Sequence, residues 1–140
     1  MTDYPNFLAS EIEQTPLQQA GFAVLPVPYE KTVSYSGGTG LGPAAILQAS
    51  EQLELWDGKS VPAEHGIHTC APIDCSGSGE QTIDRIAQAT CDILKAGAMP
   101  VVLGGEHTVT FGVIKGYLDA GFTDFGVVQI DAHADLRQAY

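Results

Sequence analysis

The sequence is poor in basic residues. It has 6 Lys and Arg against 17 Asp and Glu, which gives a formal net charge of −11 at pH 7. Binding of DNA or RNA needs a positive surface that replaces the counterions of the phosphates, so this charge balance argues against a nucleic-acid partner. An acidic chain attracts cationic ligands instead, although salt screens that attraction.

Long apolar runs and cysteines are also scarce. No stretch is long enough to span a membrane, and the chain does not open with the basic and apolar segments of a signal peptide. The 3 cysteines, an odd number, do not suggest a disulfide framework and favour a reducing compartment. For these 140 residues we therefore expect one domain with a real core, no membrane partner and a cytoplasmic location.

The pattern that points to chemistry lies near the end of the chain. The apolar run Phe125–Ile130 is rich in β-branched residues and predicts a buried strand. Asp131, His133 and Asp135 follow at alternate positions, and alternate side chains of an extended chain share one face. Carboxylates and imidazoles gathered at a strand end are typical ligands of manganese, zinc or iron. A merely solvated surface is the weaker interpretation, because crowded ionisable groups repel each other or need partners.

A second pattern leads to the same place. The apolar run Met99–Leu103 predicts a strand, Gly104-Gly105-Glu106-His107 follows it, and a helix is predicted from about residue 107 to 120, before Gly121. The apolar face expected for this helix consists of Val109, Val113, Ile114, Tyr117 and Leu118. A strand–helix–strand unit has parallel strands, and functional sites form at the carboxyl ends of such strands. We therefore expect His107 beside the Asp/His/Asp set; the alternative is a capping or buried histidine.

The motif Gly104-Gly105-Glu106-His107-Thr108, followed by Asp131-Ala132-His133-Ala134-Asp135, resembles the ureohydrolase family of arginases and agmatinases. This resemblance implies a three-layer αβα sandwich with a mainly parallel sheet, of which residues 1–140 form the N-terminal part. It also implies two Mn²⁺ ions, with Asp131 bridging both, His107 and Asp135 binding one ion, and His133 binding the other. Asp131 and Asp135 would then be catalytic, and Asp135 would pass a proton to the leaving amine. The substrate-binding residues stay unknown.

The implied reaction is hydrolysis of a guanidino C–N bond with release of urea. The loop Tyr29–Pro43 looks more like that of agmatinases, so we expect the small cationic compound agmatine to give putrescine and urea in polyamine biosynthesis. An arginase or a guanidinobutyrase is the alternative within the family. The family's loop usually carries arginines around its Gly-Thr pair, whereas this loop has Ser, Gly and Gly. Family resemblance also implies a homo-oligomer, either a trimer or a hexamer.

The family's second aspartate pair, Asp-x-Asp on a later strand, has no counterpart in this sequence. We therefore expect the 140-residue chain to be inactive alone. Two alternatives come from other functional classes. A dinuclear metallophosphoesterase also has Asp-x-His after a strand, but its further motifs come later and in another order. The other is a metal-binding relative without enzymatic activity.

Periodicity and turn residues predict the remaining elements. These are a short amphipathic helix through Leu8, Ile12 and Leu17, a strand Phe22–Pro28, a helix from Pro43 to about Trp56, a short strand Gly66–Cys70, and a helix between a Ser78/Gln81 capping box and Gly97. The prolines of Phe22–Pro28 indicate an edge strand or a strand end. We expect Trp56 in the core or at a subunit interface.

Overall fold

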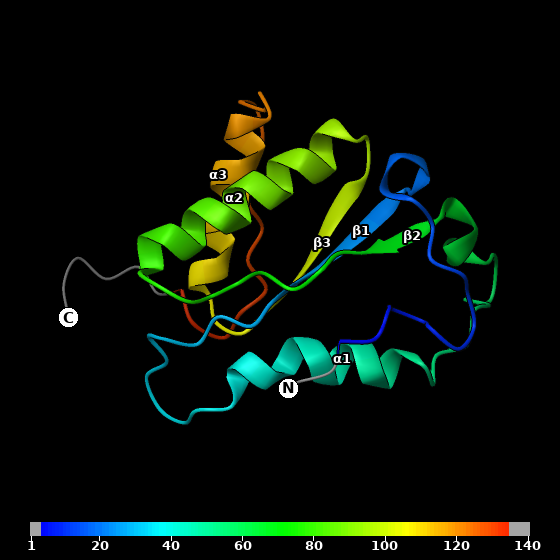
Figure 1. Cartoon of the computed structure of the whole chain (residues 1–140), viewed down its shortest axis with the longest axis horizontal. Helices are drawn as coiled ribbons and strands as arrows, with labels where there is room; N and C mark the ends of the chain where they lie inside the picture. Colours follow the sequence, from blue (N-terminus) through cyan, green and yellow to red (C-terminus); the bar gives the residue numbers. More distant parts are fainter. Residues whose placement is uncertain (1–3, 135–140) are drawn as a thin grey trace.

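The computed structural model describes residues 4–134. Its elements are η1 (Leu17–Gln19), β1 (Phe22–Val27), η2 (Thr39–Leu41), α1 (Gly42–Ser50), η3 (Pro62–His65), β2 (Ile67–Thr69), α2 (Gly79–Lys95), β3 (Met99–Gly104) and α3 (Thr108–Asp119). Within these residues the strands form one parallel sheet in the order β2-β1-β3. Helix α1 covers one face of the sheet, and α2 and α3 cover the other (Figure 1). The predicted three-layer parallel αβα sandwich is therefore confirmed.

Strand β1 is central, so the edge position allowed by its prolines is wrong, whereas the alternative, a strand end, holds for Pro28, which follows the last strand residue Val27. It pairs with β3 from Phe22↔Met99 to Val27↔Gly104, and with the shorter β2 up to Val24↔Thr69. The carbonyl of Pro26 accepts from the N–H of Ile73 at 2.9 Å, so the nitrogen of Pro26 faces the same side, beyond the end of β2. The missing N–H of this proline therefore interrupts no pairing in the sheet.

Helix α2 begins and ends where the sequence predicts. The Ser78 side chain accepts from the N–H of Gln81, and the Gln81 side chain accepts from the N–H of Ser78, so the capping box is present. Gly97 follows the helix with φ of +89°, a left-handed conformation that glycine adopts without strain. The buried side of α2 includes Ile86 and Ala87, each 1% exposed.

Helix α3 packs on α2 through glycines that lie outside the predicted apolar face, while Val109 of that face is buried in the core. Its buried residues are Val109, Gly112 and Gly116. A Cβ at Gly112 would lie 2.8 Å from the Cβ of Ile86, and a Cβ at Gly116 would lie 2.6 Å from the Cβ of Thr90. The two helix backbones therefore approach so closely that a side chain at either glycine would collide with α2. Apolar periodicity misses this contact, since glycine has no side chain to mark it.

The predicted strand Phe125–Ile130 is not formed. The segment has no regular secondary structure, and its apolar side chains are exposed by 61% at Val127, 89% at Val128 and 98% at Ile130. It stays close to α3, where the ring of Phe125 lies 5.7 Å from that of Tyr117. A strand exists through backbone hydrogen bonds to a neighbour, and here the segment does not pair with β3. Of the strands expected near Phe22, Met99 and Phe125, the first two lie side by side.

The predicted N-terminal helix is also wrong. Leu8 has φ of +58°, so the chain reverses there, and residues 7–12 form turns before the short η1. The reversal is stabilised where the N–H of Leu8 donates to the side chain of Ser50 at 2.9 Å. Burial of the Leu8 side chain, which is 6% exposed, contributes as well.

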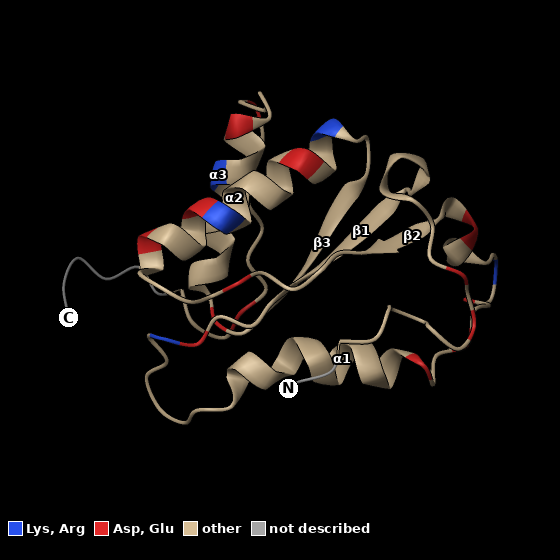
Figure 2. Cartoon of the chain, viewed as in Figure 1, with Lys and Arg blue, Asp and Glu red and all other residues tan. Residues whose placement is uncertain are grey.

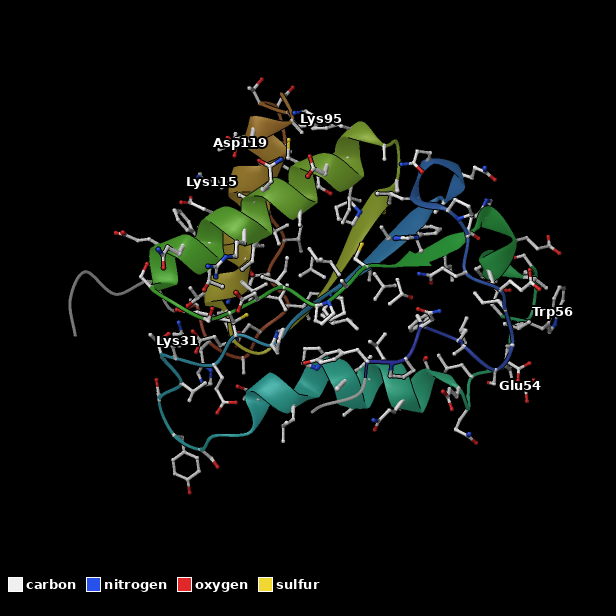
Figure 3. The ribbon with its side chains drawn as sticks, viewed as in Figure 1. Lys31, Glu54, Trp56, Lys95, Lys115 and Asp119 are labelled. Atoms are coloured by element: carbon white, nitrogen blue, oxygen red, sulfur yellow. The ribbon has the colours of Figure 1, made fainter. Side chains whose placement is uncertain are left out.

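Helix α1 begins near Pro43 as predicted but ends at Ser50 rather than near Trp56. The Ser50 hydroxyl donates to the carbonyl of Leu47 at 2.6 Å, which competes with continuation of the helix. Trp56 lies beyond the helix, is 59% exposed and points away from the sheet (Figure 3). The expected core position of Trp56 is therefore wrong, and its place at a subunit interface stays a prediction.

Charged residues occur along the helices and in the loops, and acidic positions outnumber basic ones (Figure 2). The Lys115 ammonium pairs with the carboxylate of Asp84 and so connects α3 to α2. Such exposed pairs contribute little to stability, on the order of 0–1 kcal/mol. None of the helices formed by residues 4–134 combines the length and the hydropathy needed to cross a bilayer.

Replacing Gly116 by Ala should lower the free energy of unfolding by about 1–2 kcal/mol, because overpacking between α2 and α3 outweighs the helix propensity that alanine gains. Gly42→Ala is the matched control, since the nearest atom to a Cβ at Gly42 is the Gly104 carbonyl oxygen at 3.8 Å. Urea denaturation of both variants measures the difference. A Gly116→Ala protein as stable as Gly42→Ala would contradict the close packing of these helices.

Candidate metal centre

A tight turn at the end of β3 positions His107. Strand β3 ends at Gly104, and His107 is the N-cap residue of α3. Between them Gly105 packs against the chain that follows β1, where a Cβ on Gly105 would lie 2.2 Å from the carbonyl oxygen of Tyr29 and 3.3 Å from the Cα of Gly40. No side chain fits in that space. The turn therefore brings His107 to the carboxyl ends of β1 and β3.

Asp131 lies beside His107 although the strand predicted before it is absent. The Oδ2 of Asp131 is 3.7 Å from Nε2 of His107, and its Oδ1 is 3.6 Å from Nδ1 of His133. The Asp131 side chain is 18% exposed, against 76% for His107 and 81% for His133. The structure thus brings three of the four predicted ligands together around one carboxylate. The fourth, Asp135, lies outside the described residues.

Two hydrogen bonds hold the carboxylate of Asp131. The N–H of His133 donates to Oδ1 at 2.9 Å, and the amide of Gln129 donates to Oδ2 at 3.3 Å. The His133 bond, then the Gln129 bond, lower the pKa of Asp131 against a smaller effect of desolvation, and the imidazoles of His107 and His133 lower it further. Asp131 therefore presents an ionised carboxylate at neutral pH, which is the form that binds cations.

The chemistry of these donors fits a divalent cation, because a carboxylate and two imidazoles suit manganese, zinc or iron. Within residues 4–134, however, no group of three or more His, Cys, Asp or Glu side chains is arranged to enclose a metal ion. The described residues accordingly offer part of a coordination sphere, and the imidazoles, both exposed, are accessible to an ion from solvent.

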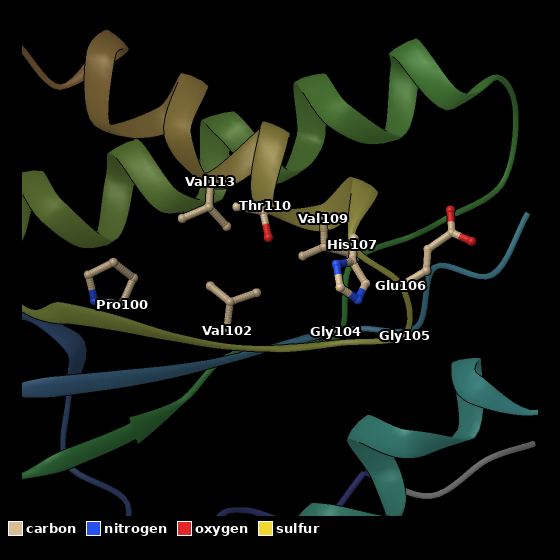
Figure 4. A pocket seen from close by; sticks show the side chains of 9 residues that line it. All are labelled: Pro100, Val102, Gly104, Gly105, Glu106, His107, Val109, Thr110 and Val113. Carbon is tan, nitrogen blue, oxygen red and sulfur yellow. The ribbon is translucent and has the colours of Figure 1, made fainter. Parts of the chain in front are cut away.

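His107 stands between two pockets. One is a groove of about 490 Å³ between β3 and α3, with Val102, Val109 and Val113 along its walls and His107 at one end (Figure 4). The other has a volume of about 420 Å³ and lies between the Gly105–Thr108 turn and the loop after β1. The second pocket, which we call the polar pocket, has hydroxyl groups from Thr32, Ser34, Thr39 and Thr108 in its lining beside the apolar side chain of Val33.

Sequence reasoning gives no role to Glu106, the residue next to His107. Its carboxylate accepts from the N–H of Thr32 at 2.9 Å and from the Thr32 hydroxyl at 2.6 Å. The signal for this contact is weak, because it consists of one acidic residue inside the Gly-Gly-Glu-His motif and one threonine in a distant loop. The structure adds Glu106 and Thr32 to the surroundings of the site.

The sequence is similar to one protein family and to named members of the curated proteins. Residues 20–140 match the model of the Arginase family. A protein of Synechocystis sp. named N(1)-aminopropylagmatine ureohydrolase is 38% identical over 96% of this chain and 46% of its own length. A protein of the same name from Thermus thermophilus is 39% identical over 89% of this chain and 43% of its own length.

A solved structure gives the same result for the fold. The agmatine ureohydrolase of Thermoplasma volcanium superposes with a TM-score of 0.77 at 29% identity, over 90% of this chain and 42% of that one. The chain thus spans less than half the length of the relatives that it matches.

The amide proton of His133 should report the ionisation of Asp131. Because the pKa of Asp131 is lowered in the folded chain, the hydrogen bond from His133 persists above the unfolded-state pKa and is lost only as pH falls through the lower folded-state pKa. An NMR titration should place the change in the His133 amide shift below about pH 3.9, the value of an unperturbed aspartate. Asp131→Asn should remove this transition. A midpoint at or above that pH would show that the carboxylate is not held as described.

Proposed function

This chain belongs to the arginase family, and from that premise we propose that it is part of a metal-dependent hydrolase that cleaves a guanidino C–N bond and releases urea. The proposal is supported mainly by one contact at the end of β3. There the Gly-Gly-Glu-His motif and the Asp-Ala-His motif approach each other, with Nε2 of His107 3.7 Å from Oδ2 of Asp131. Residues from separate parts of the chain meet there, and the relatives bear the names of ureohydrolases.

We assign the metal to Asp131, His107, His133 and Asp135. Divalent manganese held by these residues would supply Lewis acidity and would lower the pKa of a bound water, so that a nucleophile would be available near neutral pH. The chain's own contribution is to present Asp131 without a competing proton, since the pKa of its carboxyl is lowered. The Gln129 amide and the His133 N–H hold that carboxylate in place. Asp135 is the candidate for transferring a proton to the leaving amine.

Agmatine is the substrate expected from the loop after β1, and the comparisons favour a second candidate. The relatives named for N(1)-aminopropylagmatine are 38% and 39% identical to this chain, whereas the agmatine ureohydrolase of Thermoplasma volcanium is 29% identical. We therefore propose a substrate class consisting of agmatine and its aminopropyl derivative, a longer cationic chain. The ratio of kcat/KM for the two compounds, measured by urea release, decides between them.

An inactive or non-enzymatic relative is the competing interpretation. Urea-release assays of the full-length protein distinguish an enzyme from an inactive relative, because only an enzyme releases urea from a guanidino compound. The same assay should also be run on residues 1–140. We expect no urea release from residues 1–140, which offer an incomplete coordination sphere. Manganese as the resident metal, a homo-oligomer and a cytoplasmic location stay predictions of the family resemblance.

Asp131→Asn in the full-length protein should abolish turnover and remove most of the bound manganese, because an amide cannot carry the negative charge that a bridging carboxylate supplies. Asp124→Asn is the matched control, since Asp124 precedes the same segment and lies outside the proposed metal site. Urea release and metal content by elemental analysis are the measurements. Normal manganese content and activity in Asp131→Asn would show that Asp131 is not a ligand.

A further inference from the structure

Two carboxylates organise the loop formed by residues 30–41, which we call the 30–41 loop. Glu30 accepts from the N–H of Gly38 at 2.7 Å and from the N–H of Gly40 at 2.6 Å, so it closes the loop on itself. Glu106 binds the opposite part of the loop through the N–H and the hydroxyl of Thr32. One carboxylate therefore shapes the loop, and the other attaches it to the turn before α3.

The attachment lies next to His107. Glu106 precedes this residue, and the hydroxyl of Thr108 lies 3.4 Å from that of Thr32. The Glu106 side chain points away from the apolar groove between β3 and α3 (Figure 4), towards the polar pocket that it also lines. The 30–41 loop thus forms one wall of the polar pocket, and the turn with His107 forms the other.

The polar pocket suits an extended cationic ligand. Its described lining contains hydroxyl groups and the Glu106 carboxylate but no Lys or Arg side chain. Lys31, which is next to Thr32, does not line the pocket, because its ammonium donates to the carbonyl of Gly77. An amine chain entering beside His107 would therefore meet oxygen acceptors without a competing cation.

We propose that Glu106 is a positioning residue that fixes the 30–41 loop as the wall of a pocket for the amine chain of the substrate, away from its guanidino group. This inference rests on the proposed function. The pocket holds a part of the substrate that does not react, so its contacts are equal in the ground state and the transition state. Loosening the wall therefore raises KM and leaves kcat nearly unchanged.

The test compares variants of the full-length protein loaded with manganese. Glu106→Gln should raise KM for agmatine or its aminopropyl derivative about three- to tenfold, the size expected from loss of a hydrogen bond. Its kcat and manganese content should stay within about twofold of the parent. Thr32→Val should act in the same direction, Thr32→Ser should restore the parental KM, and the effects of Glu106→Gln and Thr32→Val should not add, since both remove one interaction.

Asp57→Asn provides the matched control. Asp57 also holds a loop through backbone N–H groups, those of Lys59 at 2.8 Å and Ser60 at 2.7 Å, and it takes no part in the polar pocket. The Asp57→Asn variant should have the same KM as the parent protein. An unchanged KM in Glu106→Gln, a loss of kcat alone, or a Thr32→Ser variant as impaired as Thr32→Val would each overturn the proposal.

Amide hydrogen exchange separates this proposal from the proposed function. Glu106→Gln should accelerate exchange in residues 32–40, and Asp57→Asn should not. If the parent protein cleaves no guanidino compound, the proposed function fails and the assignment of the pocket to substrate fails with it, while exchange still decides whether Glu106 orders the loop. Unchanged exchange in Glu106→Gln overturns the positioning role whatever the activity.

Discussion

The close contact between Gly105 and the carbonyl group of Tyr29 determines where the residues of the candidate site lie. Strands β1 and β3 pair in register up to Val27↔Gly104, so the chains that leave them must diverge within very little space. A Cβ on Gly105 would stand 2.2 Å from the oxygen of Tyr29, which no side chain allows. Because glycine permits the contact, the loop after β1, the Glu106 carboxylate and His107 come together at one end of the sheet.

The chain stabilises carboxylates mainly with backbone N–H groups. The pKa values of Glu30, Asp57, Asp74 and Asp131 are all lowered, and in each case the largest cause is a backbone hydrogen bond, from Gly40, Ser60, Ser76 and His133 respectively. With 6 Lys and Arg against 17 Asp and Glu, most carboxylates have no basic side chain for a partner. Asp131, the one of these carboxylates that lies beside His107, is held in place without an ammonium or guanidinium group, which suits a site for metal cations.

Local signals in the sequence predict part of this arrangement, and long-range contacts account for the rest. The Ser78/Gln81 capping box and the glycines after β3 involve neighbours in sequence, so β3, α2 and α3 are predicted close to their observed bounds. Val109 and Val113 of the predicted α3 face pack in the core, but the contact of α3 with α2 is missed because Gly112 and Gly116 carry no apolar side chain. The Phe125–Ile130 strand is predicted wrongly because composition shows strand propensity but not whether the segment forms backbone hydrogen bonds with a neighbouring strand. The contact between Thr32 and Glu106 joins residues 74 positions apart and has no local signature.

We propose that His107, Asp131 and His133 form part of one metal centre at the carboxyl ends of β1 and β3. The most direct test is a crystal structure of the full-length protein grown with manganese, with anomalous diffraction data that locate the metal. The account predicts an anomalous peak within direct coordination distance of Asp131, with His107 and His133 among the other ligands. Manganese bound elsewhere, or His107 separated from Asp131 in the presence of the metal, would contradict it.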